Sequence, residues 1–118
     1  APAFAALLEP DYPVVNEPAA PPELPLERYA GQYANAYLGP VAVALENGAL
    51  VMRLGPEQRP ARLTSLGRHR FAYEPVGENA GGPSAVTFRI GDAGRAEGLV
   101  IDNLNTAGMG SLRRLTSL

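Results

Sequence analysis

Four acidic side chains of this chain could in principle pair for acid–base chemistry of the glycosidase type. Two carboxyl groups on either side of a glycosidic bond can act as acid and base, or as acid and nucleophile. The candidates are Glu46, Asp92, Glu97 and Asp102. Glu46 and Asp92 fall at expected hairpin turns, where acidic residues are common because they are solvated and favour turn geometry. A structural role is therefore favoured over a catalytic pair.

The single histidine, His69, stands between Arg68 and Arg70. A catalytic histidine is usually oriented by a carboxylate, and the sequence offers no acidic residue with an evident tie to His69. A histidine metal site would need further ligands, for which only scattered carboxylates are available. We therefore expect a partly exposed histidine on a strand, with no metal and no cofactor.

The tripeptide Tyr33-Ala34-Asn35 matches the Tyr-x-Asn element of serine β-lactamases and penicillin-binding proteins. That machinery also needs Ser-x-x-Lys, in which the lysine helps to deprotonate the nucleophilic serine. All ten basic residues of this chain are arginine, so the machinery is incomplete here. The favoured interpretation is a tyrosine that packs in the core and an asparagine at a strand edge.

The composition describes one domain with a sizeable core. The chain has 118 residues, of which 46% are hydrophobic. Its net charge of −2 gives no electrostatic case for a nucleic-acid partner. The absence of cysteine excludes disulfides and thiolate metal sites and leaves the compartment open. No apolar run approaches the roughly 20 residues of a membrane-spanning helix.

The stretch from Val41 to Leu54 predicts a β-hairpin with a defined register. Asn47-Gly48 suits a two-residue type I′ turn, because both positions of that turn need a positive φ. With the turn placed there, the apolar side chains fall on one face. The expected facing pairs are Leu45 with Leu50, Val43 with Met52, and Val41 with Leu54.

A second hairpin is expected around Ala93-Gly94, where Gly94 can adopt the left-handed conformation of a turn. In that register Phe88 faces Leu99 and Val86 faces Ile101. Eight strands are predicted in all, near residues 29–37, 40–46, 49–55, 60–67, 69–75, 84–91, 95–103 and 109–116. Short antiparallel strands at this spacing form a sandwich or a barrel. We expect an all-β, up-and-down antiparallel barrel, because closing the sheet removes exposed edges.

The last predicted strand carries a conflict, because Leu112 and Leu115 have opposite parity. A bulge or a frayed end is needed there. The Gly-rich loop at 76–83 has no apolar periodicity, and we expect it to be mobile.

The chain is divided on composition into residues 1–25 and a barrel at 26–118. Residues 2–8 could form a short helix. Six prolines then fall between Pro10 and Pro25, so residues 9–25 are expected to be an extended linker or a strap on the barrel surface. Leu24, Leu26 and Tyr29 are expected to lie on one helical turn, with plain coil as the alternative.

The barrel interior is the remaining place for a ligand. Small barrels either fill with side chains or hold one apolar ligand, and a filled core is the favoured alternative for strands of this length. The candidate lining residues are Val41, Val43, Leu45, Leu50, Met52, Leu54, Phe71, Tyr73, Val86, Phe88, Leu99 and Ile101.

Turn and core marks from residue 26 to 116 give the chain a family resemblance. The marks are Tyr29-Ala30-Gly31-Gln32-Tyr33, Gly39-Pro40-Val41, Glu46-Asn47-Gly48, Phe71, Val86-Thr87-Phe88 and Asp92-Ala93-Gly94-Arg95. The chain resembles the lipocalin-like β-barrel domain of unknown function appended C-terminally to class C β-lactamase, penicillin-binding protein and D-aminopeptidase-related serine hydrolases. The sequence departs from that pattern at Arg68-His69-Arg70, before Phe71, where relatives often carry an aromatic residue. A second departure is the Gly-rich segment 77–83.

The resemblance implies a non-catalytic accessory domain that shapes substrate access or subunit assembly. Its partner would be the catalytic domain of the same parent chain or a neighbouring subunit, with the catalytic residues lying upstream of this chain. By analogy with related hydrolases, the location would be periplasmic or otherwise extracytoplasmic. The alternative is a stand-alone barrel that binds a small apolar ligand.

Overall fold

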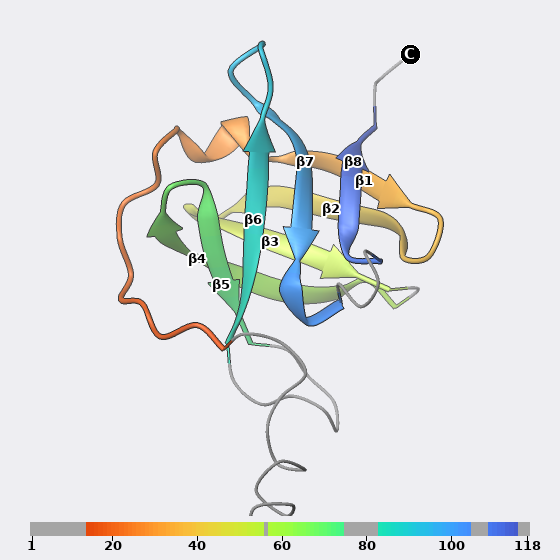
Figure 1. Ribbon diagram of the computed structural model, residues 1–118, viewed down its shortest axis with the longest axis horizontal. Coiled ribbons are helices and arrows are strands. Elements are labelled where there is room, and N and C mark those ends of the chain that lie inside the picture. The colour runs from red at the N-terminus through yellow and green to blue at the C-terminus, as the bar shows by residue number, and fades with distance from the viewer. Residues whose placement is uncertain (1–13, 56, 75–82, 105–108, 116–118) are drawn as a thin grey trace, which may run out of the picture.

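The computed structural model describes residues 14–55, 57–74, 83–104 and 109–115, and these residues form a closed β-barrel (Figure 1). Its eight strands are β1 (Gly31–Asn35), β2 (Gly39–Glu46), β3 (Ala49–Leu54), β4 (Arg59–Gly67), β5 (Arg70–Tyr73), β6 (Ser84–Ile90), β7 (Ala96–Ile101) and β8 (Ser111–Arg114). Two single 3-10 turns accompany them, η1 (Leu26–Arg28) and η2 (Asp102–Leu104).

Each strand pairs with its neighbour in the sequence, and β8 pairs with β1 to close the barrel. All pairings are antiparallel, so the chain runs up and down around the barrel axis. The closing seam is short, with the register pairs Tyr33↔Arg114 and Ala34↔Arg113. The prediction of an eight-stranded antiparallel barrel is confirmed, and a sandwich is excluded.

The first hairpin has the predicted register. Val43 faces Met52 and Leu45 faces Leu50 across β2 and β3. Asn47 and Gly48 have φ angles of 51° and 81°, as a type I′ turn requires. Turn chemistry and hydrophobic pattern therefore specify the same pairing.

Leu45 differs from its expected burial, because 46% of its surface is exposed. It is the second-last residue of β2 and lies next to the turn at the barrel rim, opposite the buried Leu50. Strand alternation gives it the right face, but the hairpin tip extends past the packed interior. Period two determines the direction of a side chain and not its depth along the barrel axis.

The second hairpin also has the predicted pairs, Phe88 with Leu99 and Val86 with Ile101. Gly94 has a φ of 76°, as expected for its turn. The register shifts by one residue between Arg89 and Ile90, so a bulge lies next to this turn. Bulges of this kind are common at barrel rims.

His69 lies in a turn and not on the expected strand. Arg68 and His69 connect β4 to β5 with φ angles of 52° and 62°. Left-handed backbone is uncommon outside glycine, although histidine adopts it more readily than arginine. The strand prediction for residue 69 was wrong because no Asn, Asp or Gly at these two positions signals a tight turn.

Aromatic side chains fill the centre of the barrel. Tyr29, Phe71 and Phe88 contact one another with ring centroids 5.0–5.4 Å apart. Tyr33 packs against Phe88 from the other side, at 6.0 Å. Of the twelve candidate lining residues, ten are buried, Leu54 is partly buried and Leu45 is exposed. The remaining buried apolar residues are Tyr29, Tyr33, Leu63, Ala85, Ala96 and Leu112.

The parity conflict in the last strand is resolved at its end. Leu112 is buried, β8 ends at Arg114, and Leu115 is 50% exposed. The buried parity of Leu112 places Arg114, not Leu115, on the inner face of the barrel.

Residues 14–25 form a strap on the outside of the barrel (Figure 1). Val15 N donates to Pro83 O and Ala20 N donates to Ser65 O, both at 2.9 Å. The strap then leads into η1, a single helical turn at Leu26–Arg28 that contains Leu26 of the three expected residues, while Leu24 and Tyr29 lie outside it. The helix expected at 2–8 and most of the loop expected at 76–83 lie outside the described residues. Within the described part of the chain, no helix combines the length and apolar character needed to cross a membrane.

Candidate functional site

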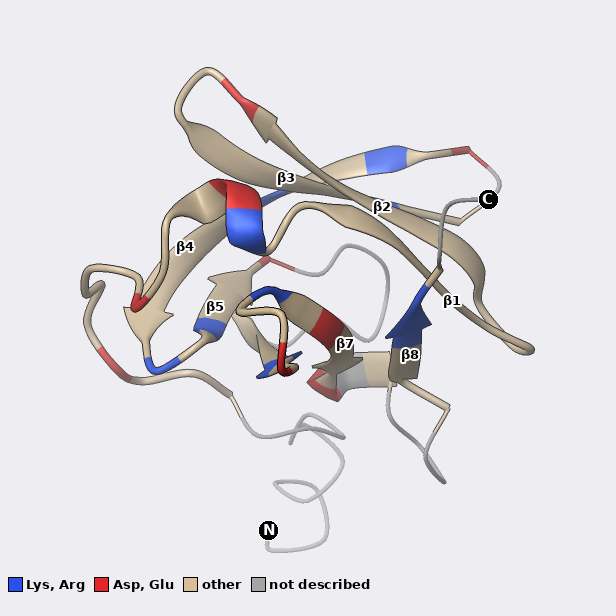
Figure 2. Cartoon of the chain, turned by 90° about the horizontal axis from the view of Figure 1, so that it is seen from above, with Lys and Arg blue, Asp and Glu red and all other residues tan. Residues whose placement is uncertain are grey.

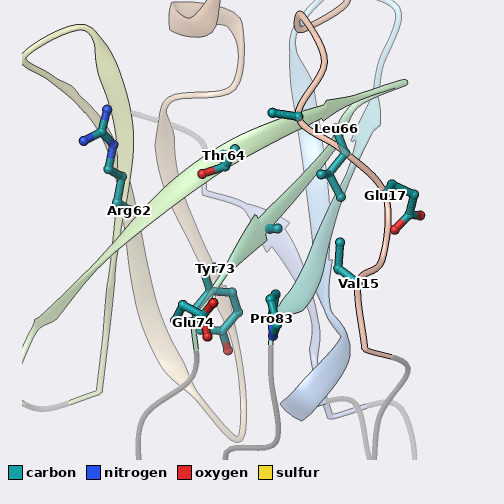
Figure 3. Close-up of a pocket in the computed structure, with 10 residues that line it drawn as sticks. Val15, Glu17, Arg62, Thr64, Leu66, Tyr73, Glu74 and Pro83 are labelled. Carbon is teal, nitrogen blue, oxygen red and sulfur yellow. The ribbon is translucent and has the colours of Figure 1, made fainter.

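A groove of about 240 Å³ lies between the strap and the outer surface of β4 and β5 (Figure 3). Val15 and Glu17 approach it from the strap, while Arg62 and Thr64 lie along β4 (Figure 3). Glu74 and Pro83, at the ends of β5 and of the segment before β6, border it at one end. Most of the remaining lining is apolar, from Ala19, Leu66, Ala72 and Tyr73.

An ion pair helps to hold the strap beside this groove. Glu17 of the strap binds Arg70 at the start of β5. The hydrogen bond from Arg70 lowers the pKa of the Glu17 carboxyl. The two residues are 53 positions apart, so no local sequence pattern could have predicted their contact.

The groove is amphipathic. Arg62 and Thr64 are exposed and share the outer face of β4, since they are two residues apart on one strand. Among the described residues, Arg62 has no ion-pair partner. The lining also holds the carboxylates of Glu17 and Glu74, so the groove suits a protein segment that combines apolar side chains with charges of both signs.

The end of the barrel that η1 covers carries a hydrogen bond between two aromatic residues. Tyr29 Oη lies 2.8 Å from His69 Nδ1 and accepts from Leu24 N at 3.3 Å. Burial raises the pKa of the Tyr29 hydroxyl. The contact joins the residue that follows η1 to the β4–β5 turn, so His69 has a structural partner and, among the described residues, no carboxylate partner.

At the seam between β8 and β1, an arginine extends into the barrel mouth. Arg114 Nη2 donates to Ala30 O at 3.0 Å and to Tyr33 Oη at 3.1 Å, and Arg114 Nε donates to Ala96 O. Its guanidinium carbon lies 5.1 Å from the centroid of the Tyr33 ring, within cation–π range. Arg114 therefore ties together β1, the segment before it, and β7.

Tyr33 is fully buried, and burial raises the pKa of its hydroxyl to about 12. In an unfolded chain the hydroxyl titrates near 10. The native state therefore keeps a proton that the unfolded state loses, and stability should fall as the pH rises from about 10 to about 12.

We expect this loss to be at most about 1.4 kcal/mol per pH unit from Tyr33. Urea unfolding across the alkaline range measures it, with the near-ultraviolet absorbance of tyrosinate as a second readout. The variant Tyr33→Phe should show a shallower decline with pH. An unchanged decline in that variant would exclude Tyr33 as the source.

The four candidate carboxylates have separate surroundings. Glu46 binds Arg53 at 3.0 Å across the first hairpin, and Glu97 lies 3.8 Å from Arg95. Asp92 is exposed in the β6–β7 turn. Asp102 begins η2, and burial raises the pKa of its carboxyl. Among the described residues, no group of three or more His, Cys, Asp or Glu side chains could hold a metal ion.

The Tyr-x-Asn element has a structural role at both positions. Tyr33 Oη donates to Tyr29 O at 2.7 Å inside the core. The Asn35 amide donates to Met109 O at 2.6 Å and to Ser111 O at 3.0 Å, while its oxygen accepts from Leu38 N at 2.7 Å. Asn35 thus joins the β1–β2 turn to the start of β8, and sequence reasoning missed this cross-link.

Sequence reasoning also missed the groove. Arg62 and Thr64 were recognisable only as polar residues on an expected strand. Val15 and Glu17 fall in a segment whose main local feature is its proline content. The Pro-rich composition did predict a strap as one alternative. Which strands it would cross depends on contacts between distant residues.

Comparisons with known proteins agree with this architecture. The crystal structure of the C-terminal domain of penicillin binding protein Rv0907 superposes with a TM-score of 0.67 and 26% sequence identity, covering 88% of this chain and 94% of that chain. No curated protein matches the chain. The family model of a domain of unknown function, DUF3471, matches residues 16–111. The eight-stranded barrel described here therefore belongs to the DUF3471 family.

Proposed function

We propose that this barrel is a non-catalytic accessory domain of a β-lactamase-related serine hydrolase. In this proposal the groove beside the strap packs against the catalytic domain of the same parent chain and shapes substrate access to it. The observation that carries the proposal is the similarity to the C-terminal domain of a penicillin binding protein across 88% of the chain. The division into residues 1–25 and 26–118 remains a prediction.

The contacts of the strap support the choice of docking face. Two backbone hydrogen bonds and the Glu17–Arg70 ion pair attach it to β4, β5 and the segment before β6. A domain that precedes the strap in the parent chain would therefore be held on this side of the barrel. The amphipathic groove would be the nearest surface for it to contact.

The isolated chain should not hydrolyse a chromogenic cephalosporin or a nitrophenyl ester, whereas the full-length gene product should hydrolyse at least one of them. The reason is that the proposal places the nucleophilic serine and its lysine upstream of this chain. Steady-state absorbance assays on both proteins measure the difference. Turnover by the isolated chain would overturn its non-catalytic role.

The docking face can be tested in the full-length product with Thr64→Arg, which places a long charged side chain in the groove. We expect KM to rise several-fold while kcat changes little, because substrate access changes and the chemistry does not. The matched control is Gln32→Arg, on the exposed outer face of β1. Equal kinetics in the two variants would contradict docking through the groove, and a change in oligomeric state confined to Thr64→Arg would favour assembly instead.

A second candidate function is binding of a small apolar ligand. One hollow of about 230 Å³ supports it, beside the first hairpin turn, with Leu26, Leu50, Leu63 and Phe71 in its lining. The aromatic cluster occupies the interior below, so a ligand would bind at the mouth. Saturable enhancement of a fluorescent apolar dye, abolished by Leu26→Arg, would favour this function. Binding unchanged by that variant would count against it.

A further inference from the structure

Two arginines lie on the outer wall of β6, β7 and β8, one on each side of Gly98. Arg89 is directly opposite Gly98 on one side, and Arg113 is directly opposite Gly98 on the other. Residues that are directly opposite on neighbouring strands point to the same side of the sheet, so both arginine side chains project from the same surface. Neither arginine forms an ion pair within the described residues. Figure 2 shows basic residues at the C-terminal end of β8.

The glycine between them makes room for the side chain of Arg89. A Cβ atom at Gly98 would lie 2.9 Å from Arg89 Nη2, so the Arg89 guanidinium extends over this residue. It would also lie 2.9 Å from Leu112 O, a backbone atom of β8. Glycine therefore allows Arg89 to lean across β7, on the side where Arg113 stands.

Two hydroxyl groups lie on the same outer surface, in the row next to Arg89 and Arg113. Thr87, Val100 and Ser111 form the next row of facing residues across the three strands. All residues of the two rows except Gly98 line a hollow of about 140 Å³, together with Phe88, Leu99 and Leu112. Its lining contains Thr87, Ser111, Arg89 and Arg113 and no acidic residue.

We propose that this hollow, bordered by Arg89, Arg113, Thr87 and Ser111, binds a phosphoryl group. Two arginines on the same surface repel each other, and an anion bound between them would offset that repulsion. Each guanidinium offers a planar fork of N–H donors, and each hydroxyl can donate one more hydrogen bond. One fork satisfies a planar carboxylate, whereas a phosphate has more oxygens and a charge of about −1.5 to −2 that balances both arginines.

A chemical-shift titration of the full chain with inorganic phosphate at constant ionic strength tests the site. Saturable shifts are expected at the backbone amides of residues 87–89, 98–100 and 111–113. Arg89→Gln and Arg113→Gln should each weaken the affinity at least about tenfold, because each removes charge-assisted hydrogen bonds. The matched control Arg28→Gln removes one exposed arginine of η1, distant along the chain, and should leave the affinity within about twofold.

Two further arms identify the ligand and its source. Sodium acetate at the same ionic strength should bind at least about tenfold more weakly than phosphate, since a carboxylate engages fewer donors. Co-sedimentation with phosphatidic acid vesicles, whose headgroup is a phosphomonoester, against phosphatidylcholine vesicles separates a lipid headgroup from a free phosphate. The proposal is overturned by non-saturable shifts, by equal affinities for acetate and phosphate, or by equal affinities in Arg89→Gln and Arg28→Gln.

Discussion

Replacing Phe88 by alanine is expected to lower the free energy of unfolding by about 3–5 kcal/mol. Phe88 is 3% exposed and contacts three other aromatic rings, those of Tyr29, Tyr33 and Phe71, with centroids 5.0–6.0 Å away. Truncation would remove a large apolar side chain and leave a cavity that the closed barrel cannot collapse to fill. The loss is a large fraction of the 5–15 kcal/mol that stabilises a typical domain.

Urea unfolding followed by circular dichroism measures this loss. Phe88→Leu keeps most of the volume and should lose less than about half as much. Tyr37→Ala is the matched control, because Tyr37 is 70% exposed in the β1–β2 turn and should change stability by less than about 0.5 kcal/mol. If Phe88→Ala and Tyr37→Ala were equally stable, Phe88 would not be central to the core.

Replacing Arg114 by methionine should cost about 2–4 kcal/mol of stability. The methionine keeps an unbranched apolar stem, but Ala30 O, Ala96 O and Tyr33 Oη each lose their charged donor. A hydrogen bond to a charged group contributes about 1.5–3 kcal/mol, and part of that is recovered where water reaches the mouth. The seam between β8 and β1 has only two described register pairs, so the side-chain contacts carry much of the closure.

The neighbouring substitution Arg113→Met is the matched control. It removes the same charge from the next residue, on the outer face, and should change stability by less than about 0.5 kcal/mol. Hydrogen exchange at the amides of β1 and β8 gives a second readout, because seam opening should accelerate exchange there first. Equal losses in both variants would show that charge, and not the position of Arg114, is responsible.

The space around Gly31 reflects the same arrangement. A Cβ atom at Gly31 would lie 2.1 Å from Arg114 Nη1. A free arginine end could move away at little cost, but this one is held by three hydrogen bonds. The absence of a side chain at residue 31 therefore leaves room for the guanidinium that closes the seam.

The hairpins show what local sequence can specify. Asn47-Gly48 carries the turn, and Val43 and Leu50 carry the apolar alternation, so two independent local signals give the same register. In the second hairpin Gly94 and the Phe88–Leu99 pair do the same. The bulge after Arg89 changes the register only next to the turn, at the barrel rim. Eight strands could be predicted because the turn residues and the apolar alternation that specify each strand lie within a few residues of one another.

The β4–β5 turn shows where local reasoning fails. Arg68 and His69 have positive φ angles although neither residue favours them strongly. The surrounding contacts compensate, since His69 Nδ1 is 2.8 Å from Tyr29 Oη and His69 O accepts from Phe88 N at 2.8 Å. Gly67 has a φ of 82° and ends β4 as expected, but the turn that follows is stabilised by distant partners, so the next strand was expected to begin one residue too early, at residue 69.

The sequence by itself determined the all-β class, the eight strands, two hairpin registers and most of the buried face, because turn residues and period-two alternation act over a few residues. Only the tertiary structure decided that Arg114 points inward, that Leu45 lies outside the packed interior, and that the strap crosses β4 and β5. It also decided which polar residues share a surface, such as Arg62 and Thr64 at the groove, or Arg89 and Arg113 on either side of Gly98. These features depend on how far the barrel curves and on contacts between residues far apart in the chain, neither of which local patterns encode.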